Sequence, residues 1–193
     1  MNDLPLRQES PAAWAVYVSA HMDEFLLDHA SCERKAAALC MSFITKYPDR
    51  GALVEPMTAL AREELAHFLE VYRIAEKRRL CLAPQDERDT YVNGILQHLR
   101  HGRDERFLDR LIMSGLIEAR GCERFSLLAE TLEDVELKNF YHRLSQSERG
   151  HYKVFFRLAA HHFHNNAVEE AVNRLSLVES ESMLASAITA RLH

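Results

Sequence analysis

The sequence predicts an all-α protein built from a few long helices. Only 6 glycines and 5 prolines occur among 193 residues, so the residues that mark frequent turns are scarce. Apolar residues instead recur near the 3.6-residue helical period over long stretches. A chain of 193 residues with 47% hydrophobic content can bury one good core, but it is short for two independent domains. We therefore predict a single domain over residues 1–193.

The first half of the chain predicts a helical hairpin after a short leading helix. Ser10-Pro11 has the form of an N-cap and a first-turn proline, which predicts a helix over about 10–21. Apolar residues at helical spacing then predict a long helix over 23–46, which Tyr47-Pro48-Asp49 ends. The same period predicts a second long helix, which begins between residues 49 and 56 and ends near residue 79.

The second half predicts another hairpin. Leu82-Ala83-Pro84-Gln85-Asp86 breaks the helical pattern, and a short crossover helix is predicted over 90–100. Long helices are predicted over 104–132 and 135–164, separated by a tight turn. A C-terminal helix over 166–190 shows roughly helical apolar spacing and would either cap the bundle or mediate dimerisation.

Charge and cysteine content exclude several classes of protein. The net charge is −5 and no long run of like charges occurs, which argues against a nucleic-acid-binding tail. The four cysteines form no CxxC pair, so neither a zinc ribbon nor a disulfide framework is indicated, and a reducing compartment fits best. The N-terminal residues are polar and no apolar stretch is long enough to span a membrane. We therefore expect a soluble, cytoplasmic protein with no membrane partner and make no prediction of its oligomeric state.

The pattern Glu-x-x-His occurs twice, as Glu64-Leu65-Ala66-His67 and as Glu148-Arg149-Gly150-His151. Residues three apart lie on one helix face, so each pair offers a carboxylate and an imidazole to the same metal ion. The spacing alone is weak evidence, because this composition predicts roughly one such pair by chance. Its placement carries the argument, since each pair lies in the second helix of a predicted hairpin.

Each first helix supplies a central glutamate, Glu33 or Glu118. Glu33 lies about 17 residues before its turn and Glu64 about 14 after it, while Glu118 lies about 16 before its turn and Glu148 about 14 after it. In an antiparallel hairpin these positions are at one height, so all four carboxylates fall in one layer. This arrangement matches the dinuclear metal site of ferritin-like four-helix bundles and predicts such a site here. Its predicted ligands are Glu33, Glu64, His67, Glu118, Glu148 and His151.

The ligand types also indicate the metal and its surroundings. Four carboxylates balance two divalent cations in an otherwise apolar core, and mixed carboxylate and imidazole ligation suits iron or manganese. We favour two iron ions. Glu123 is the rival to Glu118, because Cys122-Glu123-Arg124 echoes Cys32-Glu33-Arg34, but it lies too close to the turn for the layer. Three residues are candidates for contact with the ligands: His29, Glu123 and Tyr141.

The chain resembles the bacterial tRNA hydroxylases that act on 2-methylthio-isopentenyladenosine next to the anticodon. The resemblance spans most of the chain and rests on four segments: Asp28-His29-Ala30-Ser31-Cys32-Glu33-Arg34-Lys35-Ala36-Ala37, Glu63-Glu64-Leu65-Ala66-His67-Phe68, Ile117-Glu118-Ala119-Arg120-Gly121-Cys122-Glu123-Arg124-Phe125 and Ser147-Glu148-Arg149-Gly150-His151-Tyr152. It implies a monooxygenase that hydroxylates the isopentenyl side chain with O2 and electrons from an external donor. Gly121 and Pro56 depart from the family pattern, but neither is a predicted ligand.

A tRNA substrate needs phosphate contacts and a pocket for its prenyl group. Basic residues that could contact phosphate are Arg73, Lys77, Arg78, Arg79, Arg100, Arg103, Arg106 and Arg110, although an ordinary solvated surface explains them equally well. Apolar residues that could line the prenyl pocket are Leu65, Phe68, Phe125 and Phe155. Two other functions remain open from the residues alone. One is a ferritin-like iron-storage or peroxide-detoxifying protein, and the other is a non-catalytic helical bundle.

Overall fold

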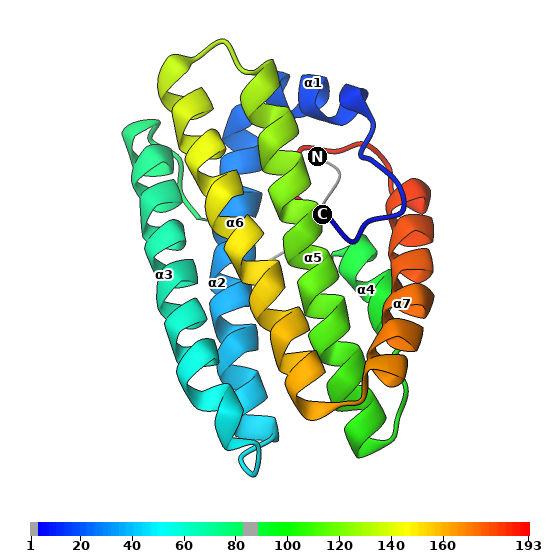
Figure 1. The fold of residues 1–193 in the computed structure, drawn as a ribbon. Coiled ribbons are helices and arrows are strands. Elements are labelled where there is room, and N and C mark those ends of the chain that lie inside the picture. The colour runs from blue at the N-terminus through cyan, green and yellow to red at the C-terminus, as the bar shows by residue number, and fades with distance from the viewer. Residues whose placement is uncertain (1–3, 83–88) are drawn as a thin grey trace. The chain divides into compact units, whose positions relative to one another are not determined.

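The computed structural model describes residues 4–82 and 89–193, and these residues form seven α-helices and one short 3-10 helix (Figure 1). The all-α prediction is confirmed. The predicted break at 82–86 lies mainly outside the described residues. No helix in the described ranges is both long and apolar enough to cross a membrane. The chain divides into two compact units, which are described separately below.

The α2–α3 unit comprises residues 20–87 and 190–192. Its two long helices are α2 (Met22–Lys46) and α3 (Val54–Lys77), which follow the predicted hairpin closely. Between them, the 3-10 helix η1 (Gly51–Leu53) leads the chain into α3. The buried residues of α3 recur at helical spacing and are Met57, Leu60, Ala61, Glu64, His67, Val71 and Ala75. Glu64 and His67 therefore lie on the apolar face that packs against α2.

Helix α3 ends in a left-handed residue. Arg79 has φ of 61°, and the amide of Leu80 donates to the carbonyl oxygen of Ala75 at 3.0 Å. The amide of Arg79 donates to the carbonyl oxygen of Glu76 at 2.8 Å, which completes the usual two-bond helix stop. Glycine is the residue that this position normally takes, because a side chain is disfavoured at positive φ. An arginine is held here instead.

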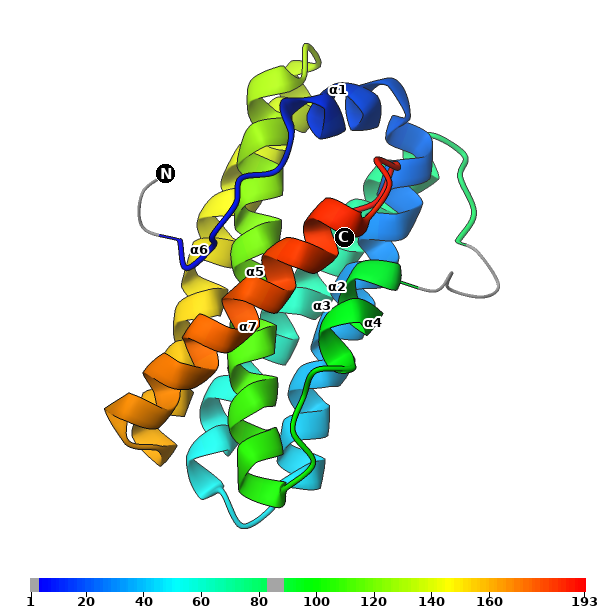
Figure 2. The same cartoon turned by 90° about the vertical axis from the view of Figure 1, so that its right-hand side faces the viewer.

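The α5–α6 unit comprises residues 1–19, 88–189 and 193. Its helices are α1 (Ala12–Ala20), of which only Ala20 falls in the other unit, α4 (Thr90–Leu96), α5 (Arg103–Thr131), α6 (Val135–His162) and α7 (Asn165–Ala185). Asp134 caps α6 by accepting hydrogen bonds from the amides of Glu136 and Leu137. Figure 2 shows α7 running obliquely along α5, with α4 beside α7.

Two predicted helices are shorter than expected. The crossover helix was predicted to reach residue 100, but α4 ends at Leu96. The amides of His98 and Leu99 donate to carbonyl oxygens three residues earlier, and the Arg100 amide donates to Asp109 Oδ2 at 2.8 Å. The C-terminal helix was predicted to reach residue 190, but α7 ends at Ala185. The chain beyond it has no regular secondary structure, and the Leu192 amide donates to Asp28 Oδ2 at 2.8 Å in the α2–α3 unit.

Three contacts fix the register between α5 and α6. The Cys122 thiol donates to the carbonyl oxygen of Ser145 at 3.2 Å. The rings of Phe125 and Tyr141 have centroids 5.6 Å apart. A Cβ on Gly115 would lie 2.6 Å from the Phe156 ring, so the two helices approach closely at this glycine. Position 115 therefore faces about residue 156, and position 122 faces about residue 145.

Candidate metal centre

The α2–α3 unit brings three predicted ligands together. Glu33, Glu64 and His67 are all buried, with relative exposures of 4%, 1% and 9%. His67 Nδ1 lies 3.6 Å from Glu33 Oε2 and 3.6 Å from Glu64 Oε2. Two carboxylates from different helices thus meet one imidazole inside the hairpin. Oxygen and imidazole nitrogen donors of this kind suit iron.

His29 touches one of these predicted ligands. It is fully buried on α2, one turn before Glu33, and its Nε2 lies 2.6 Å from Glu33 Oε1. The imidazole N–H donates to the carboxylate, which leaves Glu33 Oε2 on the side of His67. His29 is therefore placed to orient the Glu33 carboxylate.

The α5–α6 unit holds the second Glu-x-x-His pair. Glu148 and His151 have exposures of 3% and 2%, and His151 Nδ1 donates to Glu148 Oε2 at 2.9 Å. Glu118 is half-buried on α5. It lies between Gly115 and Cys122 on the face that packs against α6, and the register sets it opposite about residue 151. Glu118 is thus at the height of this pair.

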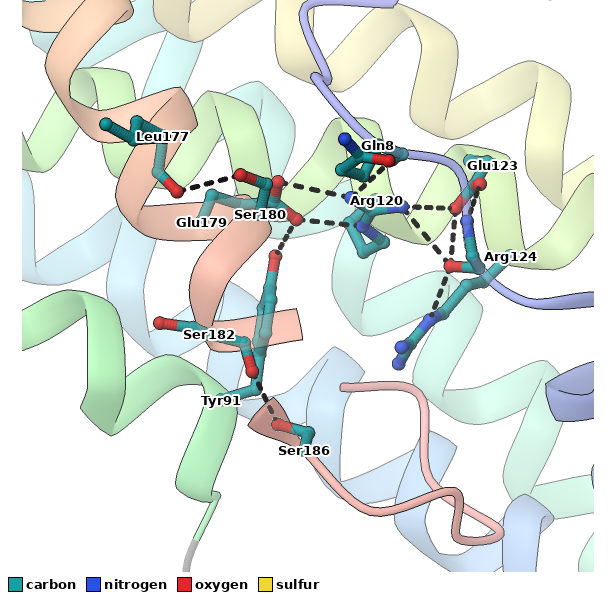
Figure 3. Close-up of polar contacts among 11 residues, drawn as sticks. Gln8, Tyr91, Arg120, Glu123, Arg124, Leu177, Glu179, Ser180, Ser182 and Ser186 are labelled. Atoms are coloured by element: carbon teal, nitrogen blue, oxygen red, sulfur yellow. Dashed lines mark hydrogen bonds and ion pairs between the residues drawn. The ribbon is translucent and has the colours of Figure 1, made fainter. Parts of the chain in front are cut away.

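Glu123 lies on a different face of α5, in a buried ionic network (Figure 3). One carboxylate oxygen accepts from the Ser10 amide at 2.5 Å, and the other accepts from Arg120 Nη1 at 2.8 Å. Ser10 Oγ donates to the same carboxylate at 2.7 Å. Both oxygens of Glu123 are therefore engaged by donors within the α5–α6 unit.

The same network contains residues that the sequence analysis missed. Arg120 and Glu179 are both fully buried, and Arg120 Nε donates to Glu179 Oε1 at 2.8 Å. The Tyr91 hydroxyl donates to the same oxygen at 2.8 Å. Burial, together with the Glu179 charge, raises the pKa of Tyr91 well above its ordinary value. The only signal in the sequence was that Arg120 and Glu179 are charged residues on the buried faces of their helices. Nothing in the sequence indicated that α5 and α7 pack together, so the two charges could not be paired.

The other residues that were predicted to lie near the site differ in their burial. Tyr141 is fully buried and packs against Phe125 and Phe140. Phe125 and Phe155 are buried, and Phe68 is half-buried. Leu65 was a candidate for the lining of the prenyl pocket, but its side chain is 51% exposed. Leu65 follows Glu64 directly, so a helical turn of about 100° carries it off the buried face.

Comparison with known proteins identifies the family. Residues 2–193 match the family model described as tRNA-(MS2IO6A)-hydroxylase (MiaE). The chain belongs to the MiaE family. It is 37% identical, over 90% of this chain and 82% of the relative, to the tRNA 2-(methylsulfanyl)-N(6)-isopentenyladenosine(37) hydroxylase of Pseudomonas putida. The hydroxylase of the same name from Salmonella typhimurium is 28% identical over 78% of this chain and 73% of its own length.

A solved structure supports the same class of fold. It is described as protein 43 with aldehyde deformylating oxygenase activity from Synechococcus, and it aligns with a TM-score of 0.92 at 33% identity. The alignment covers 97% of this chain and 94% of that chain. The ferritin-like prediction is thereby confirmed, as is the prediction of an oxygen-dependent enzyme. The buried Glu and His residues of this MiaE-family chain are consistent with iron binding.

The structure separates the basic residues that were candidates for tRNA contact. Arg110 was predicted as one of the surface cations, but its side chain is buried, so it cannot belong to a basic surface rim. Arg78 Nη1 pairs with Asp23 Oδ1 at 2.5 Å. Arg100 Nη2 pairs with the fully buried Asp109 at 2.7 Å, and Arg106 Nη1 donates to the Arg100 carbonyl oxygen. The other four candidates are exposed: Arg73, Lys77, Arg79 and Arg103.

Proposed function

We propose that this protein hydroxylates the isopentenyl side chain of 2-methylthio-isopentenyladenosine next to the anticodon of tRNA. The observation that carries this proposal is the MiaE match over residues 2–193, together with two curated hydroxylases of that name. Two buried Glu-x-x-His pairs supply the residue types that the reaction requires. A tRNA substrate supports the proposal that the protein acts in the cytoplasm.

We further propose that the two units form one ferritin-like domain and that their half-sites share two iron ions. Glu33, Glu64 and His67 would be the ligands from the α2–α3 unit, and Glu118, Glu148 and His151 those from the α5–α6 unit. Four carboxylates and two imidazoles fit a pair of iron ions in charge and in donor type. Glu118 is preferred to Glu123 because it lies on the α6-facing side of α5 at the height of His151, whereas both oxygens of Glu123 are engaged elsewhere.

The iron pair would supply activation of O2 for insertion of one oxygen atom into a C–H bond. The balance is one C–H bond, one O2, two electrons and two protons, giving one C–OH group and one water. The chain's own contribution is to hold the metal, to orient Glu33 through His29, and to keep water out with buried aromatic residues such as Phe125 and Phe155. The electrons come from an external donor, and phosphate contacts are proposed at Arg103 and Arg106.

The decisive experiment supplies iron-loaded protein with a chemical reductant, O2 and tRNA that carries the prenylated nucleoside. Mass spectrometry of the nucleoside should then show the addition of one oxygen atom. Glu64→Ala should abolish the product, because Glu64 is buried and paired with His67, whereas the adjacent and exposed Glu63→Ala should retain it. Iron-loaded protein that leaves the nucleoside unchanged would contradict the proposed function.

The choice between Glu118 and Glu123 has its own test. Iron content should fall in Glu118→Ala, whereas Glu123→Ala should keep its iron and lose thermal stability, because it leaves Arg120 with one partner fewer. The reverse result, with iron lost only from Glu123→Ala, would assign the ligand to Glu123.

A further inference from the structure

A row of four exposed residues runs along the outer side of α3. Leu65, Leu69, Arg73 and Lys77 are spaced by four residues, which places them along one ridge of the helix. Leu65 is 51% exposed and Leu69 is 43% exposed, and both cations are exposed. We call these four residues the α3 ridge. Two leucines at one end and two cations at the other make it amphipathic along its length.

The α3 ridge lies at the height of the proposed metal ligands. Leu65 stands between Glu64 and His67 in sequence, and Leu69 follows within one turn of His67. Successive residues turn by about 100°, so both leucines point away from the face that carries Glu64 and His67. A protein that covers the leucines would therefore be separated from the ligands by about one helix diameter, roughly 10–12 Å.

Three exposed cations lie near the C-terminal end of α3: Arg73, Lys77 and Arg79. Among the residues that the structure describes, Arg73 and Lys77 make no ion pair, and neither does Arg79 just beyond the helix. Arg78 differs, since it pairs with Asp23. Arg79 is kept at positive φ, where glycine would be favoured. Arg79 is thus an exposed cation at a backbone conformation that disfavours side chains.

From these observations we infer that the α3 ridge, with Arg79, is the docking surface for the redox protein that delivers electrons to the metal centre. The partner is a small protein whose acidic surface surrounds an apolar patch. This inference rests on the proposed function, which requires an external donor of two electrons for each hydroxylation. A one-electron donor docks twice in each cycle and leaves oxidised each time.

The residue types favour a protein over tRNA as the occupant. Exposed leucines flanked by cations match an interface with an apolar centre and a charged rim. Nucleic acid is bound by surfaces that are more polar, and its bases stack on aromatic or guanidinium planes rather than on leucine. Electron-transfer interfaces are small, so a single helix ridge can supply much of one.

The first test measures binding without iron or turnover. A plant-type ferredoxin, an acidic low-potential redox protein, is titrated into the metal-free chain at low ionic strength. Arg73→Glu with Lys77→Glu should weaken binding at least ~10-fold and should flatten its dependence on salt. The matched control, Lys138→Glu with Arg157→Glu, changes two exposed cations of α6 and should leave binding unchanged. Equal binding by the ridge variant and the control would overturn the inference.

The second test follows reduction of the iron-loaded chain by the same ferredoxin and, separately, by dithionite. Leu69→Gln should slow reduction by ferredoxin about 3- to 10-fold but leave reduction by dithionite unchanged, because the small reductant needs no docking surface. Leu177→Gln, at a residue of 48% exposure on α7, is the matched control. Equal slowing with both reductants would indicate damage to the site rather than lost docking and would count against the inference.

A third measurement separates the two proposals and the two classes of partner. Hydroxylation of tRNA driven by dithionite tests the proposed function alone, so its failure does not bear on ferredoxin binding. Affinity for prenylated tRNA should be unchanged in the Arg73→Glu, Lys77→Glu variant. If tRNA affinity falls and ferredoxin affinity does not, the α3 ridge binds tRNA rather than a redox protein and the inference is wrong.

Discussion

Two sets of buried carboxylates in this protein have opposite partners. Glu33, Glu64 and Glu148 lie beside imidazoles, at His29, His67 and His151. Glu123, Glu179 and Asp109 lie beside guanidinium groups, at Arg120 and at Arg100 and Arg174. All six are almost fully buried. Burial of an acid therefore does not by itself distinguish a metal ligand from a structural charge.

The partner makes the distinction. A guanidinium group is always charged and offers several N–H donors but no lone pair, so it occupies carboxylate oxygens without binding a metal. An imidazole can itself become a ligand, and its carboxylate neighbour can turn to the same ion. The imidazole-paired set is accordingly suited to bind cations, and the guanidinium-paired set to fix the positions of helices. The following predictions test this division, beginning with the largest effect.

Removing an imidazole should destroy the metal site and spare the fold. His151→Ala should lower iron-dependent hydroxylation by more than about 100-fold, because a direct ligand should matter at least as much as the groups that orient ligands. Far-ultraviolet circular dichroism should show unchanged helicity. Loss of helicity together with iron would mean that this half-site also holds the fold together.

Removing a guanidinium should have the opposite result. Arg120→Met leaves Glu123 and Glu179 buried without their shared cation, which should cost about 3–5 kcal/mol in the free energy of unfolding. Denaturant titration measures this loss. The protein that remains folded should bind as much iron as wild type, and a variant that is stable but iron-free would break the comparison.

Asp109 should make stability depend on acid pH. Burial would raise its pKa, but hydrogen bonds from Arg100 and Arg174 outweigh burial, and the pKa is lowered. A lowered folded-state pKa contributes stability above the ordinary value near 3.8, and this stability is lost as pH falls through the folded-state value. Asp109→Asn should cost about 1–3 kcal/mol at neutral pH. Its deficit should shrink below pH 4, measured by thermal unfolding across pH.

The smallest predicted effect concerns the edge of the same network. Tyr91→Phe removes one hydrogen bond to Glu179 and should cost about 1–2 kcal/mol, because Arg120 still satisfies that carboxylate. Equilibrium unfolding in urea should resolve the change. A loss as large as that of Arg120→Met would mean that Arg120 alone does not satisfy the Glu179 carboxylate once the Tyr91 hydroxyl is gone.

Periodic apolar patterns predicted the helices well, because long helices with few breaks show their buried faces in the sequence. Glu64 and His67 could be placed together because three-residue spacing is local. The Arg120–Glu179 pair joins residues 59 apart, and no local pattern reports such a contact. The same holds for two amides inside spans that were predicted as helix or just beyond them. The Arg100 amide donates to Asp109 and the Leu192 amide donates to Asp28, and neither acceptor is marked by a local pattern.

Gly115 lies one turn before Glu118, where a methyl group would come within 2.6 Å of the Phe156 ring and 3.3 Å of Phe155 Cβ. The distance between the α5 and α6 backbones at this level is therefore set by the absence of a side chain. Gly115→Ala would act as a wedge and would change the gap that Glu118 must bridge to reach the partner helix. Gly115 thus sets the spacing of the two helices that would supply Glu118, Glu148 and His151, although it is not itself a proposed ligand.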